Sequence, residues 1–405
     1  MKIFRVKPIV SALSVGALVL GMVSFVNDAG AAAKKPKVLY VPIAALASQT
    51  GSLSGAGAPY IQGAQYGVSV VNKTGFKVNG KTYKFKLTVV NDNSDTATAV
   101  QAATGLISKH NVAMFGPLSV NAPPVAQLTE QAKVIIFDPS SGLAQTAGPP
   151  TDPYTFITNG NSLDTGVYIK EAIKSFLPNA TSVALLAPSS APVTTDIPLL
   201  QSAFSSAGLT FYNDVYPSGT TVLSSILTTV ASQNPSVVLM LDSPSDYQVQ
   251  APQFAAAGVP KTVTMLQYGG TIANCTTLGA GNGYPCIADP VAGVDMSAAH
   301  VSAAAYKWIK GFAAFTNSPN LTTVIATATY ATWTYDYVSL LAQAMTKAKT
   351  VTNTTKIANA LRGKVVDATA LVGRLSFNAQ DRSMFPLEFT YVPVSGNTTS
   401  KSFAP

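Results

Sequence analysis

The chain has 405 residues and a net charge of +8, and only 11% of its residues are charged, against about 25% in ordinary globular proteins. This length is too great for one ordinary core, so it predicts two domains. The basic residues are scattered and do not alternate with aromatic residues, which argues against a nucleic-acid partner.

The first 33 residues have the layout of a secretory signal peptide. Lys2, Arg5 and Lys7 are followed by an uncharged, largely apolar run over residues 8–26 and by small residues at 31–33. We therefore expect residues 1–33 to be removed and the remainder to be periplasmic or secreted. A retained membrane anchor is the alternative, because the run approaches the length of a span. No cysteine precedes residue 34, so a lipid anchor is not expected.

A first series of strands and helices follows the signal segment. Short apolar runs indicate strands at 38–43, 84–91, 113–115 and 134–137. Amphipathic patterns indicate helices at 59–72, 96–110 and 124–132.

A second series begins after residue 156. Strands are expected at 182–187, 237–241 and 262–266, and helices at 166–176, 198–207, 222–232 and 247–257. Gly208 and Gly258 follow the ends of two of these helices. Apolar strands that alternate with amphipathic helices are typical of parallel sheets covered on both faces. We therefore predict an α/β protein with two doubly wound parallel-sheet lobes.

Cys275 and Cys286 are the only cysteines, and they bracket a Gly-rich loop. In an oxidising compartment this spacing predicts a disulfide that fixes the loop. A zinc site would need more ligands, and the only histidines are His110 and His300.

Loops at the carboxyl ends of parallel strands gather at one crevice. The loops so placed are 48–57, 92–95, 116–121 and 138–142 in the first series, and 188–193, 242–246 and 267–270 in the second. They are rich in Ser, Asn and Gly, which suits hydrogen-bonded capture of a small polar molecule. Neither histidine belongs to a catalytic motif, and no metal-spaced cluster or phosphate loop is present. We therefore expect no enzyme, no metal and no cofactor.

Several stretches resemble one known family. They are the loop SQTGSLSGAG at 48–57, the segment GPLSVNAPPVAQLTEQAKVIIFDPSS, the helix TYATWTYDYVSLLAQAMTKA and the closing segment GRLSF. Their order over residues 37–395 is similar to that of type I solute-binding proteins, in the branched-chain amino acid/amide-binding family of ABC importers. The resemblance implies two lobes joined by three crossovers and closed by hinge motion. The crossovers would lie near 157–162, 287–291 and 371–373. Lobe 1 would then contain residues 34–158 and 292–370, and lobe 2 residues 159–291 and 371–405.

The resemblance also implies which residues contact the ligand. In lobe 1 they are Leu118, Ser119, Asn121, Ser140, Ser141 and Gly142. In lobe 2 the chain departs from the family pattern, and there we expect Asp242 and Tyr268 to contact the ligand. Where amino-acid binders of the family carry an acidic residue for the ligand ammonium, this chain has Gln267 followed by Tyr268. A buried ammonium without a carboxylate would be costly, unless Asp242 or Asp246 replaced it. An amide or an aromatic acid is therefore at least as well suited as leucine or valine, and Tyr268 could stack on it.

The resemblance predicts an extracytoplasmic, monomeric solute-binding subunit that delivers a small solute to an ABC permease in the membrane. One alternative is a ligand-sensing subunit that reports to a membrane receptor. A second is a secreted scaffold whose cleft no longer binds a ligand. The sequence alone does not separate these functions.

Overall fold

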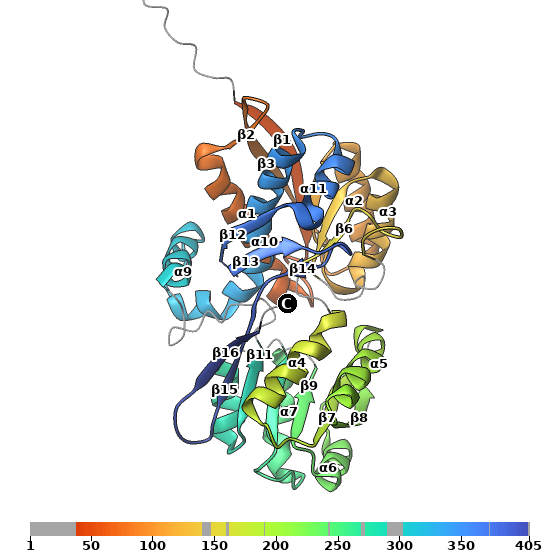
Figure 1. Cartoon of the computed structure of the whole chain (residues 1–405), viewed down its shortest axis with the longest axis vertical. Coiled ribbons are helices and arrows are strands. Elements are labelled where there is room, and N and C mark those ends of the chain that lie inside the picture. Colours follow the sequence, from red (N-terminus) through yellow and green to blue (C-terminus); the bar gives the residue numbers. More distant parts are fainter. Residues whose placement is uncertain are drawn as a thin grey trace, which may run out of the picture. The chain divides into compact units, whose positions relative to one another are not determined.

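The structure is a computed structural model that describes residues 38–139, 147–158, 162–189, 191–241, 244–268, 272–289, 303–371 and 373–403 (Figure 1). The predicted signal peptide lies outside these residues. Within them, the strands form two large sheets and one small sheet. No helix of the described residues has the length and apolarity that a membrane span needs.

The first sheet has six strands in the order β2-β3-β1-β4-β5-β6. Their bounds are β1 Leu39–Ala47, β2 Phe76–Val78, β3 Lys81–Asn91, β4 Ala113–Phe115, β5 Ile135–Asp138 and β6 Thr155–Ile157. Only β2 is antiparallel to its neighbour, because it forms a hairpin with β3. The other strands are parallel, as expected, so their carboxyl ends lie along the same edge.

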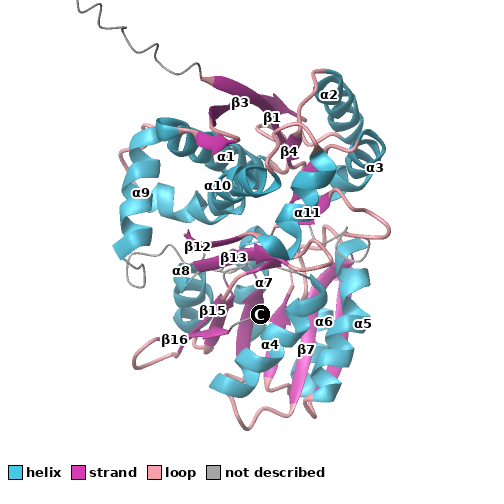
Figure 2. Cartoon of the chain, turned by 45° about the horizontal axis from the view of Figure 1, so that its top comes forward, coloured by secondary structure: helices cyan, strands magenta, loops and turns pink. Residues whose placement is uncertain are grey.

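Alternation along β1 explains why helices cover both faces of this sheet (Figure 2). Ile43 and Ala45 pack on one face with α1, α10 and α11, while Ala44 and Leu46 pack on the other with α2 and α3. The bounds of these helices are α1 Ser54–Thr74, α2 Thr96–Ser108, α3 Ala122–Ala132, α10 Leu321–Ala348 and α11 Thr354–Lys364. Helix α9, Ala303–Phe315, packs against α10 through an aromatic cluster.

Helices α1 and α10 approach so closely that two positions admit no side chain. A Cβ at Gly63 would lie 2.0 Å from the carbonyl oxygen of Ala331, and one at Gly67 would lie 2.8 Å from that of Tyr335. Residue numbers rise together along this contact, so the two helices run parallel. Because α1 begins just after the carboxyl end of β1, the first half of α10 also faces that edge.

The second sheet has seven strands in the order β16-β15-β11-β10-β9-β7-β8. Their bounds are β7 Ser182–Ser189, β8 Thr210–Pro217, β9 Val237–Met240, β10 Thr264–Tyr268, β11 Cys286–Asp289, β15 Leu387–Val392 and β16 Thr399–Phe403. Five strands are parallel, whereas β15 and β16 extend the sheet as an antiparallel hairpin. The sheet is therefore mixed, and the hairpin departs from the predicted wholly parallel arrangement.

Helices again cover both faces of the second sheet. Leu185 and Leu239 pack with α4 and α5, while Leu186 and Met240 pack with α6 and α7. These helices are α4 Ser162–Phe176, α5 Ala191–Ser206, α6 Ser224–Gln233 and α7 Pro244–Ala256. Helix α5 begins seven residues before the predicted start, with Pro198 inside it. The predicted loop at 188–193 is therefore partly strand and partly helix.

A short turn of helix and a disulfide close the end of this lobe. Helix α8, Ile272–Asn274, leads into Cys275, which is bonded to Cys286 at the start of β11. Both cysteines are fully buried among apolar residues. The predicted pairing is thus present in the structure.

The third sheet, β12-β13-β14, belongs with the first lobe. Its strands are β12 Val366–Ala370, β13 Gly373–Phe377 and β14 Ser383–Met384. The ring of Phe377 lies 4.9 Å from that of Phe156 and 6.1 Å from that of Phe137, both on first-sheet strands. By these contacts the chain leaves the first lobe between Met384 and Leu387, later than the expected crossover at 371–373.

Candidate functional site

The carboxyl edge of the first sheet carries a network of polar side chains. Ser48 follows β1 and Asp92 follows β3, and both are fully buried. The hydroxyl of Ser48 donates to Oδ1 of Asp92 over 2.5 Å. This bond joins the ends of two adjacent parallel strands, and therefore fixes the two loops that leave them.

Asp92 also accepts one bond from its own loop and one from a third loop. Its Oδ1 accepts from the backbone N–H of Ser94 at 3.0 Å, and its Oδ2 accepts from Nδ2 of Asn121 at 3.3 Å. Asn121 in turn accepts from the hydroxyl of Thr96 at 2.7 Å. Asn121 was predicted to contact a ligand. Here it is fully buried, and its amide links the loops after β3 and β4.

The loop after β1 is bound to the loop after β3 along its length. Asn91 accepts from the backbone N–H of Gln49 and donates to Thr50, whose hydroxyl donates to Asn93. Ser94 accepts from the N–H of Leu53 at 3.0 Å. These loops are therefore held in one conformation by bonds between their own polar groups.

The turn after β4 begins with two backbone N–H groups that are not used within the turn itself. Leu118 is buried, and Ser119 has φ +54°, a conformation that a residue with a side chain seldom adopts. The N–H of Asn121 donates to Leu118 O, and that of Ala122 donates to Ser119 O. The N–H groups of Ser119 and Val120 then start the turn, where no intrahelical acceptor exists. Val120 itself is 62% exposed, which adds an apolar surface at the same place.

Two buried tyrosines bind helices to this edge of the sheet by hydrogen bonds. Tyr60 is fully buried and donates to Phe137 O at 3.1 Å. Burial and the carboxylate of Asp138 raise the pKa of Tyr60 well above its ordinary value, so its hydroxyl stays protonated. Tyr337 of α10 donates to Thr158 O at 2.6 Å, just beyond β6. These two bonds fix α1 and α10 against the carboxyl ends of β5 and β6.

On the second sheet, Tyr247 of α7 joins the ends of β9 and β10. Its hydroxyl contacts the carbonyl oxygen of Met240 at 3.1 Å and that of Tyr268. Tyr268, a predicted ligand contact, is half-buried at the last position of β10. Gln267 beside it is fully buried, and neither Oε1 nor Nε2 has a hydrogen-bond partner. Gln267 is therefore a buried amide in the second lobe. It stands at the place where amino-acid binders of the family carry an acidic residue.

Four predicted contacts, Ser140, Ser141, Gly142 and Asp242, lie outside the described residues. Those described are placed at the two carboxyl edges: Leu118, Ser119 and Asn121 on the first sheet and Tyr268 on the second. Sequence reasoning singled out the loops that contain Ser48 and Asp92, but not their bond. Trp333 lies in the stretch TYATWTYDYVSLLAQAMTKA, which carries the family resemblance, but the sequence pattern indicates no role for it.

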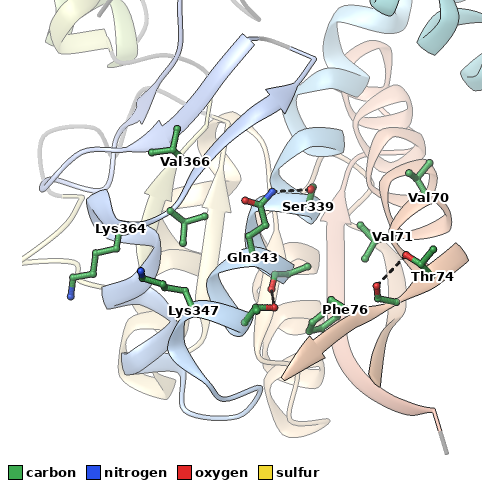
Figure 3. A pocket seen from close by; sticks show the side chains of 13 residues that line it. Val70, Val71, Thr74, Phe76, Ser339, Gln343, Lys347, Lys364 and Val366 are labelled. Carbon is green, nitrogen blue, oxygen red and sulfur yellow. Dashed lines mark hydrogen bonds between the residues drawn. The ribbon is translucent and has the colours of Figure 1, made fainter. Parts of the chain in front are cut away.

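A separate groove of about 620 Å³ lies at the opposite end of the first lobe (Figure 3). It is lined by the last turns of α1, by β2, by α10 and by the start of β12. Gln343 and Ser339 at its floor both donate to Oδ2 of Asp367, and Lys347 and Lys364 lie at its margin. Because Thr74 is the last residue of α1 and Phe76 follows it, this groove lies at the end of α1 that is remote from the polar loops.

The described residues contain no cluster of three or more His, Cys, Asp or Glu side chains that could bind a metal ion. The groups at the carboxyl edges are hydroxyls, amides, backbone N–H groups and aromatic rings. They can hold a small molecule by hydrogen bonds and stacking.

A family model described as periplasmic binding protein matches residues 40–386. The chain belongs to the periplasmic binding protein family. Members of this family are extracytoplasmic solute-binding proteins and not enzymes, so this periplasmic binding protein is a solute-binding protein as well. No curated protein sequence matches it.

Solved structures of this family share the fold at low sequence identity. The branched-chain amino acid binding protein LivJ from Streptococcus pneumoniae, in complex with isoleucine, is 19% identical, with a TM-score of 0.68 over 90% of this chain and 100% of its own. A substrate-binding protein from Desulfitobacterium hafniense, in complex with Leu, is 13% identical. Its TM-score is 0.67, over 89% of this chain and 100% of its own. A solute-binding protein from Rhodopseudomonas palustris, in complex with p-hydroxybenzoic acid, is 17% identical. Its TM-score is 0.67, over 90% of this chain and 96% of its own. The likeness confirms the predicted class, with parallel sheets in two lobes.

Proposed function

We propose that this periplasmic binding protein is the extracytoplasmic solute-binding subunit of an ABC importer. It captures a small polar or weakly charged solute between the carboxyl edges of its two sheets and delivers it to a membrane permease. The observation that carries the proposal is the polar network around Asp92, which holds three loops of the first lobe in a fixed arrangement. Loops that are already ordered lose little conformational entropy when a solute binds.

The contacts proposed for the solute are the N–H groups of Ser119 and Val120 and the hydroxyl of Ser119 from the first lobe. Ser140, Ser141 and Gly142 are proposed to add donors from the next loop, and Tyr268 and Asp242 to close on the solute from the second lobe. Asn121 is proposed to act by holding the Ser119 turn in place through Asp92. Solved relatives bind isoleucine, leucine and p-hydroxybenzoic acid, so amino acids and aromatic acids are the first solutes to test.

The test is a thermal-shift screen of the protein lacking residues 1–33, with aliphatic amino acids, amides and aromatic carboxylates. A solute that binds the native state raises the Tm by mass action, by an amount that grows with its concentration. Ser119→Ala should weaken the binding of the solute that is found by about five- to tenfold, the equivalent of one hydrogen bond. No response to any solute would contradict the proposal.

A further inference from the structure

Trp333 lies in the first half of α10, and its indole N–H has no acceptor. Nε1 is buried, and no hydrogen-bond partner is present for it. The ring is half-buried and packs at the margin of the main core. An unmatched buried N–H is unfavourable, so such a group is uncommon and needs an explanation.

The position of the ring follows from Tyr337, one helical turn further along α10. The two residues are four apart, so they share a face of the helix. Tyr337 reaches Thr158 O, which is already beyond the carboxyl end of β6. Because α10 runs parallel to α1 and away from this edge, Trp333 lies about 6 Å further toward the carboxyl edge of the sheet, along the helix axis, than Tyr337.

One aromatic ring contacts Trp333, and other apolar groups lie at the two carboxyl edges. Tyr330 meets Trp333 edge-on, with ring centroids 5.0 Å apart and an interplanar angle of 83°. Val120 is exposed at the turn after β4, and Tyr268 is half-buried at the corresponding edge of the second sheet. The two carboxyl edges therefore offer apolar surface and backbone donors, and Trp333 adds one indole donor.

We infer that Trp333 is a specificity-determining residue, and that the solute is a small aromatic carboxylate. In this arrangement the indole N–H donates to an oxygen of the solute, while its flat ring lies against Trp333 and Tyr330. The carboxylate also suits the donors of the Ser119 turn, and it needs no acidic residue opposite it. The presence of Gln267 agrees with such a solute, because a solute with an ammonium group would require an acidic residue at this place. The inference rests on the proposed function.

The chain has only two tryptophans, which gives a direct test. Trp308 on α9 also has a buried N–H without an acceptor, but it packs against Tyr66 and Tyr335, on the other side of α10 from Trp333. A ¹H–¹⁵N spectrum of the protein therefore contains two indole peaks. Trp308→Phe and Trp333→Phe assign them, and Trp308→Phe is the matched control for binding.

Benzoate is the probe, compared with cyclohexanecarboxylate, which has the carboxylate but no flat ring, and with leucine. We expect benzoate to shift the Trp333 indole proton downfield, as a new hydrogen bond would, and to leave the Trp308 peak in place. By calorimetry, Trp333→Phe should raise the Kd for benzoate about tenfold or more, whereas Trp308→Phe should change it less than twofold. Cyclohexanecarboxylate and leucine should bind more weakly than benzoate.

An unmoved Trp333 peak at saturating benzoate, or an unchanged Kd in folded Trp333→Phe, would overturn the inference. So would binding of leucine without binding of benzoate, although the proposed function would then stand. If no solute binds, both the inference and the proposed function fail. The spectrum of the unaltered protein decides the matter even if Trp333→Phe does not fold.

Discussion

The hydroxyl of Ser48 and the carboxylate of Asp92 are 2.5 Å apart, although 44 residues separate them in the sequence. Both side chains are fully buried, so the carboxylate cannot exchange this donor for bulk water. The bond joins β1 to β3 where their loops begin. It therefore couples the order of the crevice to the stability of the first lobe.

Replacing Ser48 with alanine should lower the free energy of unfolding by about 1.5–3 kcal/mol, because a hydrogen bond to a buried charged group is lost. The measurement is urea unfolding followed by circular dichroism. Ser206→Ala is the control, since its hydroxyl is exposed and bonds only Ala203 O within α5, and it should change the value by less than about 0.5 kcal/mol.

Ser48→Ala and Asn121→Ala should also be non-additive, because both residues donate to Asp92. A double-mutant cycle would give a coupling of about 0.5 kcal/mol or more. Strictly additive losses would show that the three groups do not act as one network.

The close contact of α1 with α10 predicts a large effect at Gly63. Alanine there would place a methyl group 2.0 Å from Ala331 O, so the helices would have to separate. We expect the free energy of unfolding to fall by at least about 2 kcal/mol. Tyr330, Trp333 and Tyr337 all lie on α10, so the binding of benzoate inferred above should weaken as well.

At Gly105, by contrast, a change to alanine should increase the stability. It lies inside α2, with open space around the position of its Cβ. Gly105→Ala should therefore stabilise the protein by about 0.5–1 kcal/mol, since alanine favours the helix and restricts the unfolded chain. Equal effects at the two glycines in urea unfolding would contradict the close packing of α1 on α10.

Arg362 joins segments that are far apart in the first lobe. It donates to both carboxylate oxygens of Asp381 and to Pro153 O, and Asp381 O accepts from the N–H of Ile157 at the end of β6. The ion pair is largely buried, with 14% of the Arg362 side chain and none of the Asp381 side chain exposed. Burial raises the pKa of Asp381 to about 7, although Arg362 opposes the shift.

At pH 8, Arg362→Met should cost about 3–5 kcal/mol of stability, because it leaves a buried carboxylate without its partner. The loss should shrink at pH 6, where that carboxylate can take up a proton instead. Lys170→Met is the matched control. This change removes the ion pair of Lys170 with Glu171, which is more exposed than that of Arg362 with Asp381. It should lower the free energy of unfolding in urea by no more than about 1 kcal/mol.

Much of the fold could be predicted because its signals are local. The strand at 113–115 is a run of apolar residues that is buried on both faces, and it is found where expected. The hairpin of β15 and β16 was missed, because the burial along β15 comes from joining a distant sheet edge. The third crossover was placed too early for a similar reason. Phe377 belongs to the first lobe through contacts with Phe137 and Phe156, which no local pattern reveals.

The site was predictable as a set of loops, but not as a set of contacts. The rule about carboxyl ends places the loops of Asp92 and Ser119 at one edge of the first sheet, as the structure does, since it depends only on the direction of the strands. It could not tell that Asn121 turns inward to Asp92, because that depends on side-chain partners in three dimensions. Trp333 was missed for the same reason. The role inferred for it depends on the parallel packing of α10 on α1.

Asp196 on α5 should make stability depend on pH. It is only 8% exposed, and burial raises its pKa to about 7. In the unfolded chain the carboxyl titrates near its ordinary value, so between about pH 4 and 7 the native state binds more protons. The contribution of Asp196 to stability therefore increases as the pH falls through this range, and is least favourable above pH 7.

Asp196→Asn should remove this contribution. At pH 8 the variant should be more stable than the original protein by on the order of a few kcal/mol, and the difference should shrink as the pH approaches 4. Urea unfolding at several pH values measures it. Asp95→Asn is the control with the opposite sign, because bonds from the hydroxyl and the N–H of Thr98 lower the pKa of exposed Asp95. A difference between Asp196→Asn and the original protein that does not vary with pH would show that this carboxyl is not titrating in the native state.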